Sequence, residues 1–99
     1  MDINEYEKVK RYTYLEFCNY LKKKYGTAKH NYFTSNWNKD TRVTRTNEGL
    51  ITHHICEDRA IKLSDPVYAK KNPYEMQLSE NLVYADYLEH LFLHKHHVP

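Results

Sequence analysis

Apolar residues recur along residues 13–25 at the spacing of one helical face. The positions on this face, at i, i+3, i+4, i+7 and i+11, are Tyr14, Phe17, Cys18, Leu21 and Tyr25. Thr13 is followed three residues later by Glu16, which is the pattern of a capping box. Gly26 can adopt the left-handed conformation that ends a helix. The pattern therefore predicts an amphipathic helix over residues 13–25.

The second half of the chain predicts two short strands and a final helix. Residues 49–55 are rich in apolar and β-branched side chains, and residues 82–84 form a second brief run of the same kind. Asp86 with Glu89 three residues later is another capping-box pattern. We expect the helix that begins there to continue to about His96 or His97.

A long excursion, residues 56–80, separates the two predicted strands. Pro66 and Pro73 interrupt it, and residues 74–80 predict a short helix. On the final helix, the residues that we expect to lie in the core are Leu88, Leu91 and Phe92.

Residues 27–48 are polar and mix basic with aromatic side chains. Basic groups interleaved with aromatic rings suit contact with a phosphate backbone and with bases. The alternative is a solvated loop whose aromatic residues pack back on a small core, and the pattern favours neither. The candidate nucleic-acid contacts, including one residue from the following segment, are Lys29, Trp37, Lys39, Arg42, Arg45 and Arg59.

Together these elements predict a small single α+β domain of 99 residues. Its parts are an N-terminal helical part (1–26), a basic and aromatic loop (27–48) and a strand–strand–helix module (49–97). A net charge of +2 does not by itself require a nucleic-acid partner. Two glycines are too few for the common glycine-rich phosphate-binding loops.

Several classes of protein are not expected from the composition. No run of about 18 apolar residues is present, so we expect no membrane-spanning helix. The polar, acidic start does not have the pattern of a secretory signal. Two cysteines, Cys18 and Cys56, are too few for a disulfide scaffold and do not form a CxxC pair. We therefore expect a reduced, cytoplasmic protein.

Histidines occur at positions that allow them to share a metal ion. His53 and His54 end the first predicted strand, and His90 and His94 lie four apart on the final helix. Residues four apart share a helix face with Cβ atoms about 5–6 Å apart. Two such imidazoles can bind one ion, and a third from His53 gives a site with positions left for water or phosphate. His97, one turn beyond His94, is either a surface residue or an extra ligand.

The order HH, then Asn81, then HxxxH resembles the histidine-rich branch of the HNH (ββα-metal) endonucleases over about residues 49–97. The resemblance implies that the metal ligands are His53, His90 and His94. It also implies that His54 is the general base and that the Asn81 amide holds the loop that orients it. The segment between His54 and Asn81 is long for this family, and the CxxC pairs that brace many of its members are missing.

The resemblance implies a metal-dependent endonuclease that hydrolyses phosphodiester bonds in DNA. Ligation by nitrogen alone favours bound Zn²⁺, with Mn²⁺, Ni²⁺ or Mg²⁺ as candidates for turnover. Arg59 or Lys62 would hold the phosphate. A homodimer or a larger targeting protein are the further partners that we consider.

Two other functions fit the same residues. The first is a small phage or bacterial inhibitory or binding module, in which a structural zinc stabilises an HNH-like scaffold with a small core. The second is a module that binds nucleic acid without cutting it.

Overall fold

Helix α2 (Tyr14–Tyr25) begins and ends where the sequence predicts. Thr13 Oγ1 accepts a hydrogen bond from the Glu16 amide, and the Glu16 carboxylate accepts one from the Thr13 amide at 2.8 Å. Gly26, with φ of +82°, ends the helix. The predicted capping box is therefore confirmed.

The structure is a computed structural model that describes residues 1–46 and 49–97.

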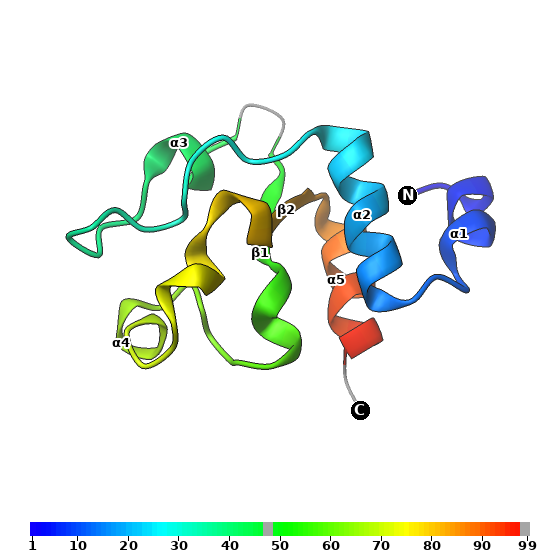
Figure 1. Ribbon diagram of the computed structural model, residues 1–99. Coiled ribbons are helices and arrows are strands. Elements are labelled where there is room, and N and C mark those ends of the chain that lie inside the picture. The colour runs from blue at the N-terminus through cyan, green and yellow to red at the C-terminus, as the bar shows by residue number, and fades with distance from the viewer. Residues whose placement is uncertain (47–48, 98–99) are drawn as a thin grey trace.

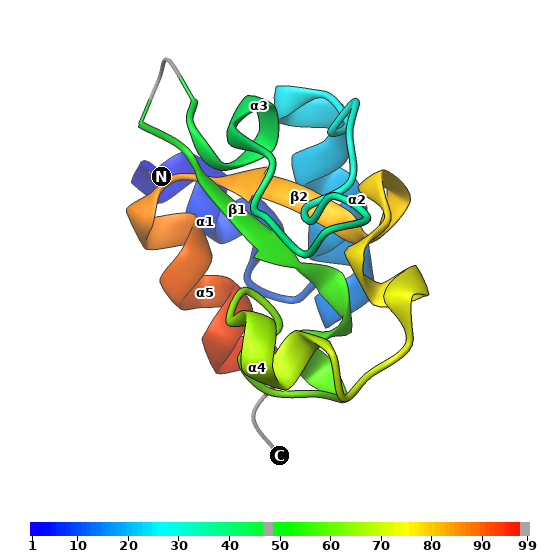
Figure 2. The same ribbon diagram turned by 90° about the vertical axis from the view of Figure 1, so that its left-hand side faces the viewer.

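The described residues form a small α+β domain with a two-stranded antiparallel sheet (Figures 1 and 2). Strand β1 (Ile51–His54) pairs with β2 (Leu82–Ala85), and helix α5 (Tyr87–His97) follows β2 directly. At the start of α5, Asp86 Oδ1 accepts from the Glu89 amide and Glu89 Oε1 accepts from the Asp86 amide, at 2.7 and 2.8 Å. The second predicted capping box is also confirmed.

The remaining elements are short. They are α1 (Ile3–Val9), α3 (Thr41–Thr44), η1 (Ile55–Asp58), α4 (Pro66–Ala69), η2 (Tyr74–Gln77) and η3 (Ser79–Asn81). Helix α1 lies outside the sequence prediction, and Asp2 caps it by accepting a hydrogen bond from the Glu5 amide. The short helix predicted over residues 74–80 is instead the two 3₁₀ turns η2 and η3.

Strand register decides which side chains of β1 lie on each face of the sheet. His53 pairs with Val83, and His54 pairs with Leu82. Paired residues of an antiparallel sheet share a face, and successive residues alternate between faces. His53 therefore lies on the Val83 face and His54 on the opposite one.

Two buried clusters cover the two faces. The cluster on the Val83 face joins α1, α2, β2 and α5 and contains Val9, Tyr14, Phe17, Cys18, Leu21, Val83, Ala85 and Leu93. The cluster on the Leu82 face contains Ala28, Tyr32, Phe33, Val43, Ala69 and Leu82. Tyr32 and Phe33 thus pack back on the core, as one of the two sequence interpretations of the aromatic loop expects.

The prediction that Leu88 and Leu91 lie in the core is wrong, because they are 54% and 49% exposed. Glu89 and Leu93 of α5 lie in the core, whereas Leu88 and Leu91 lie on a different face of the same helix. Together with α1, this Leu88 and Leu91 face of α5 lines an apolar groove of about 400 Å³. Phe92 packs against the core as a partly buried side chain. Among residues 1–46 and 49–97, the structure has no helix long and apolar enough to cross a membrane.

Candidate metal centre

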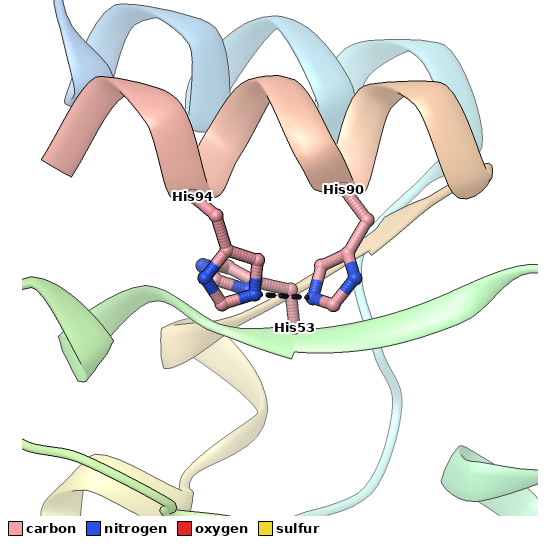
Figure 3. Close-up of side chains that lie close together, drawn as sticks. All are labelled: His53, His90 and His94. Carbon is pink, nitrogen blue, oxygen red and sulfur yellow. Dashed lines mark hydrogen bonds between the residues drawn. The ribbon is translucent and has the colours of Figure 1, made fainter. Parts of the chain in front are cut away.

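Three imidazoles from two distant parts of the chain gather between β1 and α5. His53 projects from the strand, and His90 and His94 project toward it from successive turns of the helix (Figure 3). Each of the three offers a ring nitrogen, and these atoms all lie within 4.8 Å of one another. The Nε2 atoms of His90 and His94 are 3.0 Å apart. The structure thus brings together the three residues that the sequence predicts as ligands.

The donor set suits a divalent ion that prefers nitrogen ligands. Two nitrogens bound to one tetrahedral ion, each at about 2.0–2.1 Å, lie roughly 3.3 Å apart. The 3.0 Å between His90 and His94 Nε2 is close to that value. The rings of these two residues lie 5.2 and 5.4 Å from the His53 ring, centroid to centroid. His53, His90 and His94 could therefore hold one ion after small side-chain shifts.

A cavity of about 540 Å³ gives access to these imidazoles. The described residues that line it besides the three histidines are Tyr32, Thr44, Leu50, Ile51, Thr52, Glu57, Lys62 and Ser64. Lys62 has φ of +54°, and its ammonium group lies 4.9 Å from the centre of the Tyr68 ring. One side of the candidate site thus combines a cation, a carboxylate and hydroxyl groups with the imidazoles.

His53 forms a side-chain hydrogen bond with a residue of α2. Its Nε2 lies 2.8 Å from the Tyr14 hydroxyl, and that hydroxyl donates to the carbonyl of Ile55 at 2.7 Å. Tyr14 was expected from the sequence only as part of the apolar face of its helix. Helical periodicity gives no signal for this contact, because the two partners are 39 residues apart in the chain.

His54, the predicted general base, lies on the other face of the sheet and is only 1% exposed. Its Nε2 lies 2.6 Å from Gln77 Oε1, and the Gln77 amide nitrogen donates to the Leu63 carbonyl at 3.0 Å. The Tyr32 ring packs on the imidazole at 4.3 Å between centroids. Burial lowers the pKa of His54 to about 4. Among the described residues that line the cavity, His54 does not occur.

Glu57 lies between the two strand histidines. Its Oε2 is 3.9 Å from His53 Nδ1, and its Oε1 is 4.0 Å from His54 Nδ1. Burial raises the pKa of this carboxyl. Glu57 lines the cavity, and sequence analysis did not identify it. A carboxylate three residues beyond the second histidine of the pair was the available signal.

Asn81, the residue predicted to hold the loop, donates from its side-chain amide to the Glu75 carbonyl at 2.7 Å. This contact closes the turns from residue 75 to residue 81, which carry Gln77. The Asn31 side chain braces the same turns by accepting from the Ser79 amide at 2.9 Å. Asn81 is thus linked to His54 through the loop and Gln77.

A buried carboxylate holds the start of α5 against α2. Glu89 is fully buried, and its Oε1 accepts from the Tyr25 hydroxyl at 2.7 Å. Its Oε2 lies 2.7 Å from Lys24 Nζ. Sequence analysis assigned Glu89 only a capping role. Because Glu89 directly precedes His90, this anchor also fixes the helix turn that carries the first helical imidazole.

The candidate nucleic-acid contacts lie apart from the histidine cavity, since none of the six is among the described residues that line it. Arg42 forms a bidentate pair with Asp40, and the Arg59 guanidinium contacts Cys56 Sγ at 3.2 Å. Trp37 packs against Phe33 and Tyr74. The exposed members of this set are Lys29, Lys39, Arg42, Arg45 and Arg59.

His96, near the end of α5, is not part of the set of gathered imidazoles among the described residues. His96 Nδ1 donates to the Phe92 carbonyl at 3.0 Å, and its ring packs on Phe92. The side chain of His97 lies outside the described residues.

Comparisons of the chain with protein-family models, with curated proteins and with solved structures gave no match.

Proposed function

We propose that this chain is a metal-dependent endonuclease of the HNH type that hydrolyses phosphodiester bonds in DNA. The observation that carries the proposal is the gathering of His53, His90 and His94 at a cavity between β1 and α5. The order of strand, strand and helix around them supports it. Two hydrogen bonds support it as well: Asn81 closes the turns that carry Gln77, and Gln77 contacts His54.

The three imidazoles would hold one divalent ion, for which Zn²⁺ best matches the donor set and Mn²⁺, Ni²⁺ or Mg²⁺ are candidates for turnover. When bound, such an ion supplies Lewis-acid stabilisation of negative charge on the phosphate oxygens. The chain adds Lys62 at the same cavity, whose ammonium group attracts the phosphodiester. Arg59, the other phosphate contact considered, does not line this cavity in the described structure.

His54 is assigned the role of general base. Its low pKa keeps the imidazole neutral near pH 7 and so able to accept a proton. His54 is not among the described residues that line the cavity, whereas Glu57 is. Glu57 is therefore placed to pass a proton from water in the cavity to His54 Nδ1. The water oxygen bonds to phosphorus, the bond from phosphorus to the 3′ oxygen breaks, and that oxygen takes a proton from solvent.

The proposed partner is DNA, with a homodimer or a larger targeting protein as further proposals. The apolar groove between α1 and α5 supports a protein partner, because exposed Ile3, Leu88 and Leu91 lie along it. The exposed lysines and arginines of residues 29–45 support contact with a phosphate backbone.

The burial of His54 favours a second candidate function. An imidazole that is 1% exposed and hydrogen-bonded to Gln77 also fits a scaffold in which a bound metal has only a structural role. In that case the chain is an inhibitory or binding module, and the metal contributes to folding.

Cleavage of supercoiled plasmid in the presence of Mn²⁺, Ni²⁺ or Mg²⁺ tests the proposal. We expect the wild type to nick or linearise the plasmid, and His90→Ala to reduce the rate to background. His54→Ala should lower the rate by roughly 10²–10⁴-fold, the usual contribution of a general base. His30→Ala is the matched control, because His30 lies outside the cluster, and it should cleave like the wild type.

Two outcomes would contradict this assignment. Cleavage that survives His54→Ala rejects His54 as the base. Absence of cleavage with every metal, together with unfolding of the protein by a chelator, rejects the endonuclease and favours the structural-metal module.

A further inference from the structure

The side chain of Tyr14 connects α2 to the candidate metal centre. Tyr14 is the first residue of the helix, directly after the Thr13 cap, and its side chain is buried. Its hydroxyl reaches both the Ile55 carbonyl and His53 Nε2. One oxygen atom thus contacts the residue that follows β1 and the histidine within it.

The contact with the Ile55 carbonyl determines where the proton of this hydroxyl lies. A carbonyl oxygen only accepts hydrogen bonds, so Tyr14 donates its single proton to Ile55. The Tyr14 oxygen can then only accept from His53, which makes His53 Nε2 the donor.

A neutral imidazole that carries its proton on Nε2 has its lone pair on Nδ1. Metal ions bind the nitrogen that lacks the proton, and the other N–H of a ligating histidine is held by a hydrogen-bond acceptor. Nδ1 of His53 lies on the side of the ring toward Glu57, at 3.9 Å, and Glu57 lines the cavity. The ring is therefore oriented with its lone pair toward the cavity side.

We propose that the Tyr14 hydroxyl is a positioning group for the metal centre, because it fixes His53 in the tautomer that offers Nδ1 to the ion. This inference rests on the metal-binding part of the proposed function and not on DNA cleavage. It gives α2 a role in metal binding.

The matched pair of variants is Tyr14→Phe and Tyr20→Phe. Both remove one hydroxyl from α2, but the Tyr20 hydroxyl donates to Glu5, away from the cluster. We measure Zn²⁺ affinity by competition with a chromophoric chelator. Loss of an acceptor behind a ligating histidine typically weakens binding by about 10–100-fold. We expect that loss in Tyr14→Phe and wild-type affinity in Tyr20→Phe.

A second measurement starts from the wild type, so its main result does not require that a variant folds. Nitrogen-15 NMR of the imidazoles in the metal-free wild type should show His53 with its proton on Nε2, and in the Zn²⁺ form with the metal on Nδ1. In Tyr14→Phe, both neutral tautomers of His53 should become populated.

Two results would overturn the proposal. One is a wild-type spectrum with the His53 proton on Nδ1, which also decides the matter if Tyr14→Phe does not fold. The other is equal Zn²⁺ affinity in the two folded variants. A protein that binds Zn²⁺ and shows the Tyr14 effect but leaves DNA intact would reject the endonuclease and uphold the role of Tyr14.

Discussion

His53 and His54 are neighbours in β1, yet the region of the molecule around each imidazole differs. His53 faces α2 and α5, where two further imidazoles and a cavity lie beside it. His54 faces the opposite cluster, where Tyr32 covers its ring and Gln77 binds its Nε2. The alternation of side chains along a strand separates them. A doubled histidine in a sequence therefore need not mean a doubled role.

Both imidazoles are nevertheless held in a similar way. Each has its Nε2 beside a side-chain oxygen, and each oxygen belongs to a group that donates to a backbone carbonyl. Both Nδ1 atoms lie about 4 Å from the Glu57 carboxylate, at 3.9 and 4.0 Å. Both residues are 1% exposed. The difference between the two histidines therefore lies in their neighbours, which are two imidazoles on one face and the Tyr32 ring with Gln77 on the other.

The largest difference is expected in metal binding. His53→Ala removes one of three gathered nitrogens, whereas His54→Ala leaves all three in place. We expect Zn²⁺ affinity to fall by more than about 100-fold in His53→Ala, beyond the usual effect of an outer hydrogen-bond partner. His54→Ala should retain one Zn²⁺ per chain. Elemental analysis after gel filtration measures this, and equal metal loss in both variants would remove the distinction.

A smaller effect is expected in the pH dependence of stability. The pKa of His54 is about 4 in the folded chain and 6.5 in the unfolded one, so the unfolded chain takes up the proton first as the pH falls. The contribution of His54 to the free energy of unfolding is therefore fully present above pH 6.5. By pH 4 about 3 kcal/mol of the free energy of unfolding should be lost.

Urea unfolding of the metal-free protein at several pH values tests this expectation. His54→Gln serves as the reference, because the other titrating groups are the same in both proteins. The wild type should lose more stability than the variant as the pH falls. Parallel curves for the two proteins would mean that His54 titrates near its ordinary value.

The smallest of the three effects concerns Gln77. Gln77→Met keeps the length of this buried side chain but leaves His54 Nε2 and the Leu63 carbonyl without their partner. An unsatisfied buried polar group costs about 1–3 kcal/mol. Thr52→Val is the control, since Thr52 lies in the same strand as His54. This substitution removes a half-buried hydrogen bond to the Val43 carbonyl, which should cost about 1 kcal/mol of stability.

Chemical denaturation compares these two variants, and Zn²⁺ affinity should be unchanged in both. A Gln77→Met variant as stable as the wild type would show that Gln77 does not hold His54. A loss of Zn²⁺ affinity would show that the two faces of the sheet are coupled.

The parts of the fold that local signals determine could be predicted from the sequence. Both capping boxes are short-range patterns, and they place the starts of α2 and α5 correctly. The spacing of His90 and His94 likewise fixes their common helix face. The structure brings these two together with His53, while their role as metal ligands stays a prediction.

The face that each strand histidine occupies could not be predicted from the pair itself. It depends on the register with β2 and on the two clusters that cover the sheet. The contacts of Tyr14 and Gln77 join residues 39 and 23 positions apart. The exposure of Leu88 and Leu91 also depends on packing, because α5 uses its other faces for Leu93, Glu89 and the histidines.

The shared core of α2 and the strand–strand–helix module makes the two parts one folding unit. Phe17 and Leu21 cover Val83 and Leu93, and Lys24 pairs with the buried Glu89. A peptide of residues 49–97 alone would expose this apolar face to water and leave the Glu89 carboxylate without its cation. Grafting the histidines onto another protein thus calls for a substitute helix, and splitting the chain after residue 46 offers a fragment-complementation assay.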